Sequence, residues 1–304
     1  MKRNILTVPV NKNVLRVDET MCPICGSTIG FRSYLEWEGY RWISCRNCGG
    51  GHKEPYTQEL EDSAILEKYD QDYFVPAFFE RRRKFSLNQA NWLKSNFNDG
   101  MAVVEIGPGL GLAAEAFLQL FPGTPYHAVE PHPTFADFIR TRLGNRVILH
   151  SGNPERALNE ALELATSGNR PILLYMDSVL EHVTQPYQFI QKLMAKMSTG
   201  SRALFDVPNE RGLKYRAHIY KALGGQPTVY PGHINLFTTR SFSMMLSKLG
   251  FQCYKVRQRG IRYREEVNNF PEGPVLDLIL LLLRVFPVDT LLGIGNNLRI
   301  EVEF

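Results

Sequence analysis

The stretch Glu105-Ile-Gly-Pro-Gly-Leu-Gly111 decides the fold of this chain. It closes an apolar run that begins at Ala102 and predicts a buried strand, and it precedes residues 112–121, which predict a helix. Glycines at a strand-to-helix turn let the backbone approach a ligand closely, because a Cβ atom would collide with it. The amino terminus of the helix suits an anionic group. The sequence therefore predicts a ligand-binding loop at the end of a buried strand.

Two carboxylates indicate what this loop binds. The glycine spacing is Gly-x-Gly-x-Gly rather than the Gly-x-Gly-x-x-Gly of dinucleotide binders. Glu105, just before the first glycine, repels a diphosphate and suits a cationic or amino-bearing ligand. Glu130 ends the next predicted strand, 130 − 111 = 19 residues beyond the last glycine, where one carboxylate can hold both ribose hydroxyls.

Strand and helix patterns alternate through the rest of the chain from residue 101 to residue 207. This alternation predicts right-handed βαβ units and a doubly wound, mostly parallel α/β sheet covered on both faces. Residues 298–304 alternate as a final antiparallel strand should. Asp177 to His182 follow the fourth predicted strand and would lie at the sheet edge where ligands bind. The predicted strands are 102–107, 126–130, 147–150, 172–177 and 202–207, and the helices 112–121, 134–143, 154–165 and 186–197.

Four cysteines near the amino terminus form two Cys-x-x-Cys pairs with 19 residues between them. This is the spacing of a structural zinc site, because two tight turns complete a closed tetrahedral shell of four sulfurs. A redox dithiol normally occurs once, near a βαβ unit, so the doubled pair favours zinc. We expect His52 to be a surface residue and Cys253 a buried core thiol. The predicted zinc ligands are Cys22, Cys25, Cys45 and Cys48.

Composition limits the class of protein and its partners. The 304 residues carry a formal net charge of +4 with 44% hydrophobic residues, so disorder and broad nucleic-acid binding are unexpected. No signal-peptide pattern is visible, and the longest apolar run, residues 278–283, is far shorter than the roughly 20 residues of a membrane span. We therefore expect a cytoplasmic protein in which the cysteines form no disulfides.

The predicted organisation has a zinc ribbon over residues 1–55, a helical linker or lid over 56–100 and a catalytic domain over 101–304. Helical patterns cover 59–69 and 78–97 in the linker. Its basic cluster Arg81–Lys84 is either a solvated helix face or a contact for a phosphate-bearing substrate.

Three segments in order, VVEIGPGLG, AVEPH and MDSVLEHV, resemble the successive motifs of class I S-adenosylmethionine-dependent methyltransferases. The resemblance covers about residues 100–258 and implies a seven-stranded Rossmann-like sheet and S-adenosylmethionine as cofactor. It implies contacts to the methionine portion, the ribose and the adenine. These roles fall on Glu105, Gly107, Gly109, Gly111, Glu130, Pro131, Asn153, Asp177 and Ser178.

The order of zinc ribbon and methyltransferase domain is similar to bacterial sugar methyltransferases, some of which act on nucleotide-linked sugars. The resemblance implies Tyr230 and His233 as catalytic groups. His182 is a further candidate for a catalytic or substrate role, because it follows the fourth predicted strand near the expected reaction edge. Gly232 stands where those enzymes have an acid, and we expect no counterpart of their additional carboxyl-terminal domain. His182 can instead only shape the pocket, and His233 can cap the next helix.

Three hypotheses follow. The first is a methyltransferase for a small molecule, such as a nucleotide-linked or carrier-linked sugar; the second is a zinc-ribbon-guided RNA methyltransferase; the third is a non-enzymatic scaffold. The glycines and Glu130 are intact, which argues against the scaffold, and the weak basic excess argues against RNA. The leucine-rich segment 274–292 is interpreted as core, as a homodimer interface or as a peripheral membrane contact.

Overall fold

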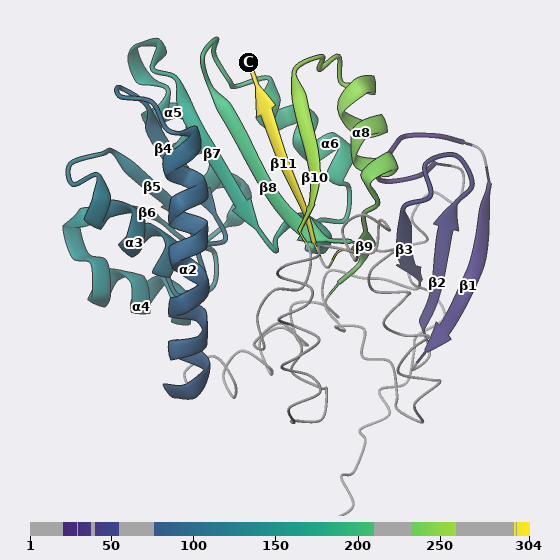
Figure 1. Cartoon of the computed structure of the whole chain (residues 1–304), viewed down its shortest axis with the longest axis horizontal. Coiled ribbons are helices and arrows are strands. Elements are labelled where there is room, and N and C mark those ends of the chain that lie inside the picture. Colours follow the sequence, from purple (N-terminus) through teal and green to yellow (C-terminus); the bar gives the residue numbers. More distant parts are fainter. Residues whose placement is uncertain are drawn as a thin grey trace, which may run out of the picture.

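The computed structural model describes residues 21–28, 30–37, 40–54, 76–209, 233–259, 295 and 297–304. These residues form two separate β-sheets, which Figure 1 shows. The larger sheet has seven strands in the order β10-β11-β8-β7-β4-β5-β6, and the smaller has four in the order β1-β2-β3-β9.

The seven-stranded sheet is mostly parallel, as predicted. Strands β4 to β8 run parallel, whereas β11 pairs antiparallel with both β8 and β10. The last strand of the chain thus enters between two earlier strands, which completes the doubly wound fold. The strands are β4 (Ala102–Ile106), β5 (Tyr126–Val129), β6 (Ile148–His150), β7 (Ile172–Asp177), β8 (Arg202–Pro208), β10 (Tyr254–Arg259) and β11 (Asn297–Glu303).

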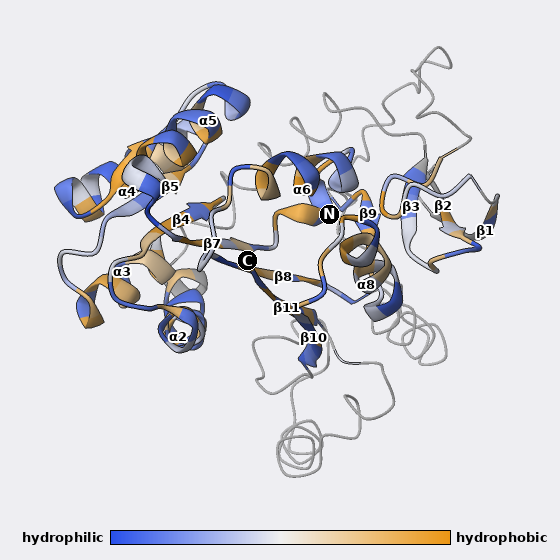
Figure 2. Cartoon of the chain, turned by 90° about the horizontal axis from the view of Figure 1, so that it is seen from above, coloured by the Kyte–Doolittle hydropathy of each residue, from blue (hydrophilic) through white to orange (hydrophobic). Residues whose placement is uncertain are grey.

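Helices cover both faces of this sheet, and two buried apolar clusters lie beneath them. Figure 2 shows the strands between α2 and α3 on one side and α5 and α6 on the other. Each helix predicted within the described residues is present to within a few residues. The helices are α2 (Pro76–Asn96), α3 (Leu112–Leu120), α4 (Pro133–Leu143), α5 (Pro154–Ala165), α6 (Pro186–Met194) and α8 (Thr239–Lys248), with short 3₁₀ turns at Gly144–Arg146, Ser167–Asn169 and Leu180–His182.

The smaller sheet joins the amino-terminal segment to the body that contains the larger sheet. Strands β1 (Phe31–Trp37), β2 (Tyr40–Cys45) and β3 (Gly51–Glu54) form an antiparallel meander, and β3 also pairs with β9 (Asn235–Leu236). The sequence analysis did not predict the pairing of β3 with β9. A strand from each region therefore fixes the amino-terminal segment against the larger sheet.

Two predictions about single residues are wrong. His52 is buried, because the β3–β9 pairing covers it and its ring packs edge-on against Phe31 at 5.3 Å. Cys253 is exposed, because it lies just before β10, the outermost strand of the sheet.

Three sequence predictions fall outside the described residues: the helix over 59–69, Tyr230 and the leucine-rich segment 274–292. Among the described helices, none combines the length and the apolar character that crossing a membrane requires.

Candidate active site

A cavity of about 1460 Å³ opens at the carboxyl ends of β4, β5 and β7. The strand order reverses between β4 and β7, and ligands of doubly wound sheets bind at such a switch point. The volume exceeds the roughly 300–1,000 Å³ of a site for one drug-sized ligand. The cavity can therefore hold two small ligands side by side. The predicted residues that line it are Glu105, Gly107, Gly109, Glu130, Pro131, Asp177, Ser178, His182 and His233.

The glycine loop needs its glycines for different reasons. At Gly107 the backbone has φ +70°, and a Cβ atom would lie 2.5 Å from Cγ2 of Val179. Gly109 has φ +54° and faces open space in the cavity, so a ligand can approach its backbone. Gly111 precedes α3, and a Cβ there would press on Ile139 and Leu143 at 3.2 Å. Gly111 therefore packs α3 against α4 and does not line the cavity.

Glu130 is buried beside this loop and held in place by backbone donors. Its Oε2 accepts a hydrogen bond from the Gly109 amide, and its Oε1 accepts one from the His132 amide, each at 3.0 Å. Burial raises the pKa of Glu130 to about 7, although both amides act in the opposite direction. The carboxylate is thus fixed at the cavity wall, where a ribose could bind.

Glu105 lies at the floor of the cavity. Its Oε2 accepts a hydrogen bond of 2.8 Å from the Tyr126 hydroxyl, and the side chain is buried. Burial raises the pKa of Glu105 to about 8, and the neighbouring Asp177 and Glu130 add to this effect. A cationic ligand at this position would stabilise the ionised carboxylate and replace the missing solvation.

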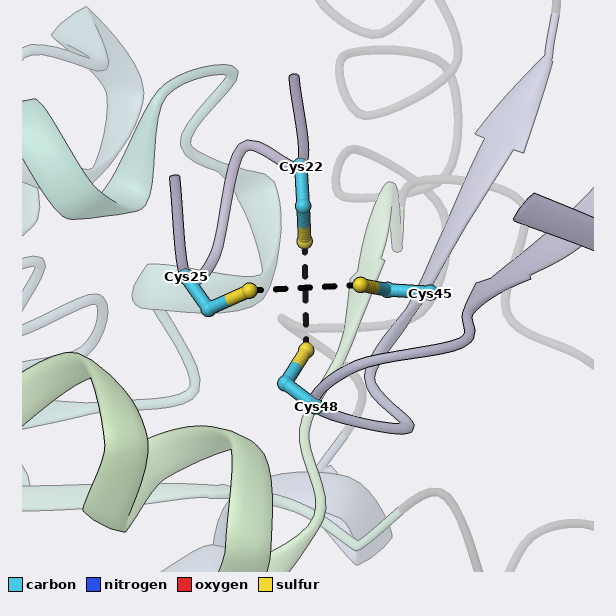
Figure 3. A group of neighbouring side chains, drawn as sticks. All are labelled: Cys22, Cys25, Cys45 and Cys48. Carbon is cyan, nitrogen blue, oxygen red and sulfur yellow. Dashed lines mark hydrogen bonds between the residues drawn. The ribbon is translucent and has the colours of Figure 1, made fainter. Parts of the chain in front are cut away.

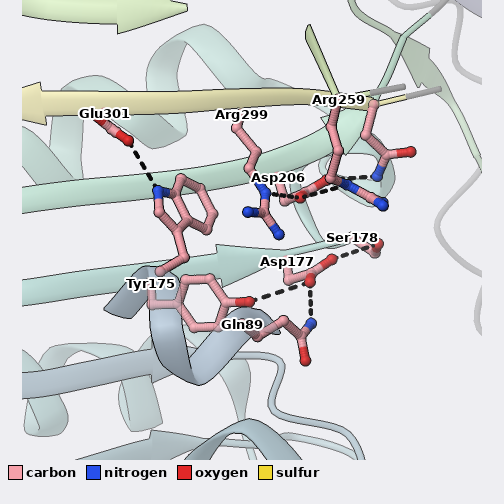
Figure 4. Close-up of polar contacts among 10 residues, drawn as sticks. Gln89, Tyr175, Asp177, Ser178, Asp206, Arg259, Arg299 and Glu301 are labelled. Carbon is pink, nitrogen blue, oxygen red and sulfur yellow. Dashed lines mark hydrogen bonds and ion pairs between the residues drawn. The ribbon is translucent and has the colours of Figure 1, made fainter. Parts of the chain in front are cut away.

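Asp177 gathers donors from two elements, as Figure 4 shows. It accepts hydrogen bonds from the Gln89 amide of α2, from the Tyr175 hydroxyl at 3.2 Å and from the Ser178 hydroxyl at 2.8 Å. Ser178 has a left-handed backbone with φ 57°, which turns the chain at the end of β7. Sequence reasoning missed Gln89, because a polar residue on a helix gives no signal of which strand end it contacts.

An ion network around the buried Asp206 lies beside Asp177, as the same figure shows. Asp206 of β8 accepts from Arg299 at 3.0 Å, and Arg259 lies 3.6 Å away. The Arg299 guanidinium stacks over Trp92 of α2, 4.6 Å from the ring centroid. These contacts tie α2, β8, β10 and β11 together, so the strand ends beside Asp177 are rigid.

Glu181, His182 and His233 meet on the other side of Asp177. Glu181 is fully buried, and its Oε1 lies 3.7 Å from Nε2 of His233. The rings of His182 and His233 pack edge-on with centroids 5.1 Å apart. Burial raises the pKa of Glu181 to about 8, although His182 acts in the opposite direction. The structure thus brings both predicted histidines together and adds Glu181, which sequence reasoning passed over although it stands in the quoted motif.

Other predicted contacts differ in how closely they approach the cavity. Gly152 lines the cavity, but Asn153 does not; its side chain caps α5 by accepting from the Arg156 amide at 3.1 Å. Its contact to adenine stays a prediction. Arg82 of the basic cluster lines the cavity, whereas its neighbour Arg83 lies 3.7 Å from Glu80 on the exposed side of α2.

The four predicted cysteine ligands converge on one point, as Figure 3 shows. Their sulfurs lie within 4.8 Å of one another, with 3.9 Å between Cys22 and Cys48 and between Cys25 and Cys45. Zinc–sulfur bonds of about 2.3 Å in a tetrahedron place the sulfurs about 3.8 Å apart. Disulfides need about 2.05 Å, and the structure shows all four thiols free. The cluster is therefore compatible with a zinc ribbon.

The sheet, the glycine loop and the two carboxylates define a class I S-adenosylmethionine-dependent methyltransferase. A family model described as a methyltransferase domain matches residues 78–256, more than half of the chain. The chain therefore belongs to this family.

Solved structures and curated relatives agree with this assignment. A S-adenosylmethionine-dependent methyltransferase from Archaeoglobus fulgidus superposes with a TM-score of 0.52 at 15% identity, over 77% of this chain and 100% of its own. That likeness shows the fold.

Ribosomal RNA small subunit methyltransferase A of Cupriavidus metallidurans is 30% identical over 101 residues, 30% of this chain and 36% of that protein. The protein of the same name from Burkholderia lata is 30% identical over 92 residues, 30% of this chain and 33% of its own length. The chain thus spans about a third of the length of these curated relatives.

Proposed function

We propose that this protein methylates a small phosphate-bearing molecule, a nucleotide-linked or carrier-linked sugar. The observation that carries the proposal is the lining of the cavity, which includes the glycine loop as well as Glu181, His182 and His233. We call the part at the glycine loop the cofactor half and the part at these three residues the acceptor half. Three basic side chains line it as well: Arg82, Lys192 and Lys196. Cations at a cavity wall favour an acceptor that carries phosphate.

The cofactor half holds S-adenosylmethionine through the residues predicted from the sequence. Glu130 would bind the ribose and Glu105 the methionine amine, while the backbone at Gly107 and Gly109 allows close approach. Pro131 would pack beside the adenine. Asp177 and Ser178 would face the methionine end, fixed there by Gln89 of α2. Bound at this place, the cofactor supplies an activated methyl group.

The acceptor half aligns the nucleophile with that methyl group. Alignment and exclusion of water account for most of the rate enhancement that such a reaction needs. As the new bond forms, the carbon–sulfur bond breaks and its electron pair stays on sulfur. His182 or His233 can accept the acceptor's proton, since an imidazole titrates near neutral pH. Tyr230, outside the described residues, is a further candidate for this role.

The cysteine cluster holds a structural zinc ion that supports the acceptor half. Four thiolates close the shell and leave no open position, so the ion has no direct part in the chemistry. The ribbon contacts the body through the β3–β9 pairing and through hydrogen bonds to three of its carbonyls. Lys248 donates to the Cys25 carbonyl at 2.7 Å, the Tyr187 amide to the Pro23 carbonyl at 3.1 Å and the Thr238 hydroxyl to the Cys48 carbonyl at 3.4 Å.

The test is a transfer assay with S-adenosylmethionine labelled in its methyl group. The purified chain is incubated with a panel of nucleotide sugars and carrier-linked saccharides, and the mass gain of each is measured. The proposal expects one methyl group on a sugar of the panel and loss of transfer in Glu130→Gln. Glu160→Gln, on the exposed face of α5, is the matched control and keeps its activity. Methylation of RNA alone would contradict the proposal.

The RNA alternative has one observation in its favour. The curated relatives are ribosomal RNA methyltransferases, and the match covers about a third of each. Ribosomal RNA added to the same assay decides between the two. An RNA methyltransferase would also lose RNA affinity steeply as salt increases.

A further inference from the structure

The geometry points to a metal site apart from the cysteine cluster. We propose that Glu181, His182 and His233 bind a divalent transition-metal ion at the wall of the methyl-transfer cavity. The ligand set would be two imidazole nitrogens and one carboxylate oxygen, a combination that suits ions such as Mn²⁺ or Zn²⁺.

The positions of the three side chains come close to such a ligand set. Their candidate ligand atoms all lie within 4.8 Å of one another, and Glu181 Oε1 lies 3.7 Å from His233 Nε2. An ion with bonds of about 2.0–2.2 Å places neighbouring ligands about 3.0–3.5 Å apart. Ion binding would have to bring these atoms closer by about 1 Å.

The carboxylate of Glu181 gives an independent reason for a cation here. The side chain is 0% exposed, and neither oxygen accepts a hydrogen bond from any residue in the part of the chain that the structure describes. A buried carboxylate without donors is costly, and native proteins compensate such groups with donors, ions or water. A bound ion would supply a partner for this carboxylate.

Backbone hydrogen bonds hold the segment that carries His233 next to the segment that carries Glu181. The Ile234 amide donates to the Glu181 carbonyl at 2.9 Å, and the Lys53 amide of β3 donates to the Ile234 carbonyl at 2.9 Å. His233 therefore stays beside Glu181 although 52 residues separate them (233 − 181). The cysteine-bearing segment thus supports the residues just before β9, where His233 lies.

Three protein ligands leave open positions on the ion, as catalytic metal sites require. This part of the inference rests on the proposed function. An acceptor hydroxyl at an open position would have a lowered pKa and lose its proton to solvent. Its oxygen then forms the bond to the methyl carbon, while the carbon–sulfur bond breaks and its electron pair remains on sulfur. The histidines would act as ligands, so neither would need to act as base.

The test is a titration of the full-length chain with Mn²⁺, after mild chelation that leaves the cysteine-bound metal in place. Electron paramagnetic resonance measures the free ion, and pulsed experiments detect nitrogen coupling from imidazole. We expect one equivalent of bound Mn²⁺ with nitrogen coupling. Glu181→Gln and His233→Asn should weaken binding by more than the roughly 10–100-fold that loss of an outer-shell partner causes. Glu155→Gln removes another acid that lines the cavity and keeps the affinity.

Cofactor binding, measured by calorimetry on the same samples, shows that each variant is folded. A wild-type chain that binds S-adenosylmethionine but no Mn²⁺ would overturn the metal site and leave the proposed function intact. Equal Mn²⁺ affinity in the wild type, Glu181→Gln and His233→Asn would overturn it as well. Failure to bind the cofactor would count against the proposed function, whereas the Mn²⁺ titration would still decide the metal site.

Discussion

The two halves of the cavity are built in different ways. The cofactor half uses backbone at the ends of neighbouring parallel strands, and its side chains come from residues 105–132 and 177–178. The acceptor half uses side chains from distant parts of the chain, because His233 lies beside Glu181 only through the contacts of Ile234. The geometry of the cofactor half follows from the order of the parallel strands. The geometry of the acceptor half depends on contacts with other segments that hold its side chains in place. The halves should therefore fail under different perturbations.

Removal of the metal proposed at the four cysteines should have the largest effect of all the changes considered. The effect should be confined to the acceptor half of the cavity. Structural zinc contributes about 10–16 kcal/mol in small zinc domains, so chelation should unfold the segment 21–54 and release β9. Hydrogen exchange should then show lost protection at β3, β9 and Glu181. Affinity for S-adenosylmethionine, measured by calorimetry, should stay near the wild-type value. Retained hydrogen-exchange protection after chelation would contradict this prediction. So would a loss of protection that is equally large in the cofactor half and in the acceptor half.

Gly107→Ala should damage the cofactor half. Its Cβ would lie 2.5 Å from Val179 Cγ2 on a backbone with φ +70°. Overpacking of about 1–3 kcal/mol plus left-handed strain of about 1–2 kcal/mol predicts roughly 100-fold weaker cofactor binding. The double variant Gly107→Ala, Val179→Ala should recover part of the loss, because it removes the clash and leaves the strain.

Gly144→Ala is the matched control for this prediction. Gly144 also has a positive φ, +51°, but a Cβ there meets nothing within 4 Å and the residue lies away from the cavity. Calorimetry should give wild-type affinity for this variant. Unchanged affinity in Gly107→Ala would show that the loop is not the cofactor cradle.

The pH dependence of stability should report on Glu105. Its folded-state pKa is raised to about 8 by burial, so the folded chain keeps a proton that the unfolded chain releases above its ordinary value of 4.5. The free energy of unfolding of the ligand-free protein should therefore fall as pH rises from about 5 to 8, by at most about 1.4 kcal/mol per pH unit from this group.

Glu105→Gln should make this slope shallower in urea titrations at several pH values. The control variant Glu160→Gln, on the exposed face of α5, should keep the wild-type slope. If the free energy of unfolding had the same pH dependence in Glu105→Gln and in the wild type, Glu105 would not be the group that keeps its proton in the folded chain.

The smallest expected effect concerns the acceptor half. Arg82 lines the cavity, whereas Arg83, its neighbour on α2, lies beside Glu80. Arg82→Gln should raise the KM for a phosphate-bearing acceptor by about 10-fold, the loss of a charge-assisted hydrogen bond of about 1.5 kcal/mol. Arg83→Gln should leave the KM unchanged. Equal effects in both variants would remove the support for a phosphate at this wall.

The same contrast explains what could be predicted from the sequence. The parallel sheet, the glycine loop and Glu130 follow from local patterns, because strand ends and glycines act within a few residues. The four cysteines also follow from spacing, since metal geometry fixes it. Gln89 and Glu181 could not be assigned, because their roles depend on packing between segments distant in sequence. The burial of His52 was missed for the same reason: it requires the β3–β9 pairing, which two residues of β9 do not signal.

The central claim is that the end of β4 and β5 binds S-adenosylmethionine. Calorimetry of the full chain with this compound tests it most directly. We predict one bound equivalent in the wild type and binding weakened by about 10–100-fold in Glu130→Gln, because a hydrogen bond to a charged group contributes about 1.5–3 kcal/mol. No binding heat in the wild type, or equal affinity in both proteins, would contradict the account.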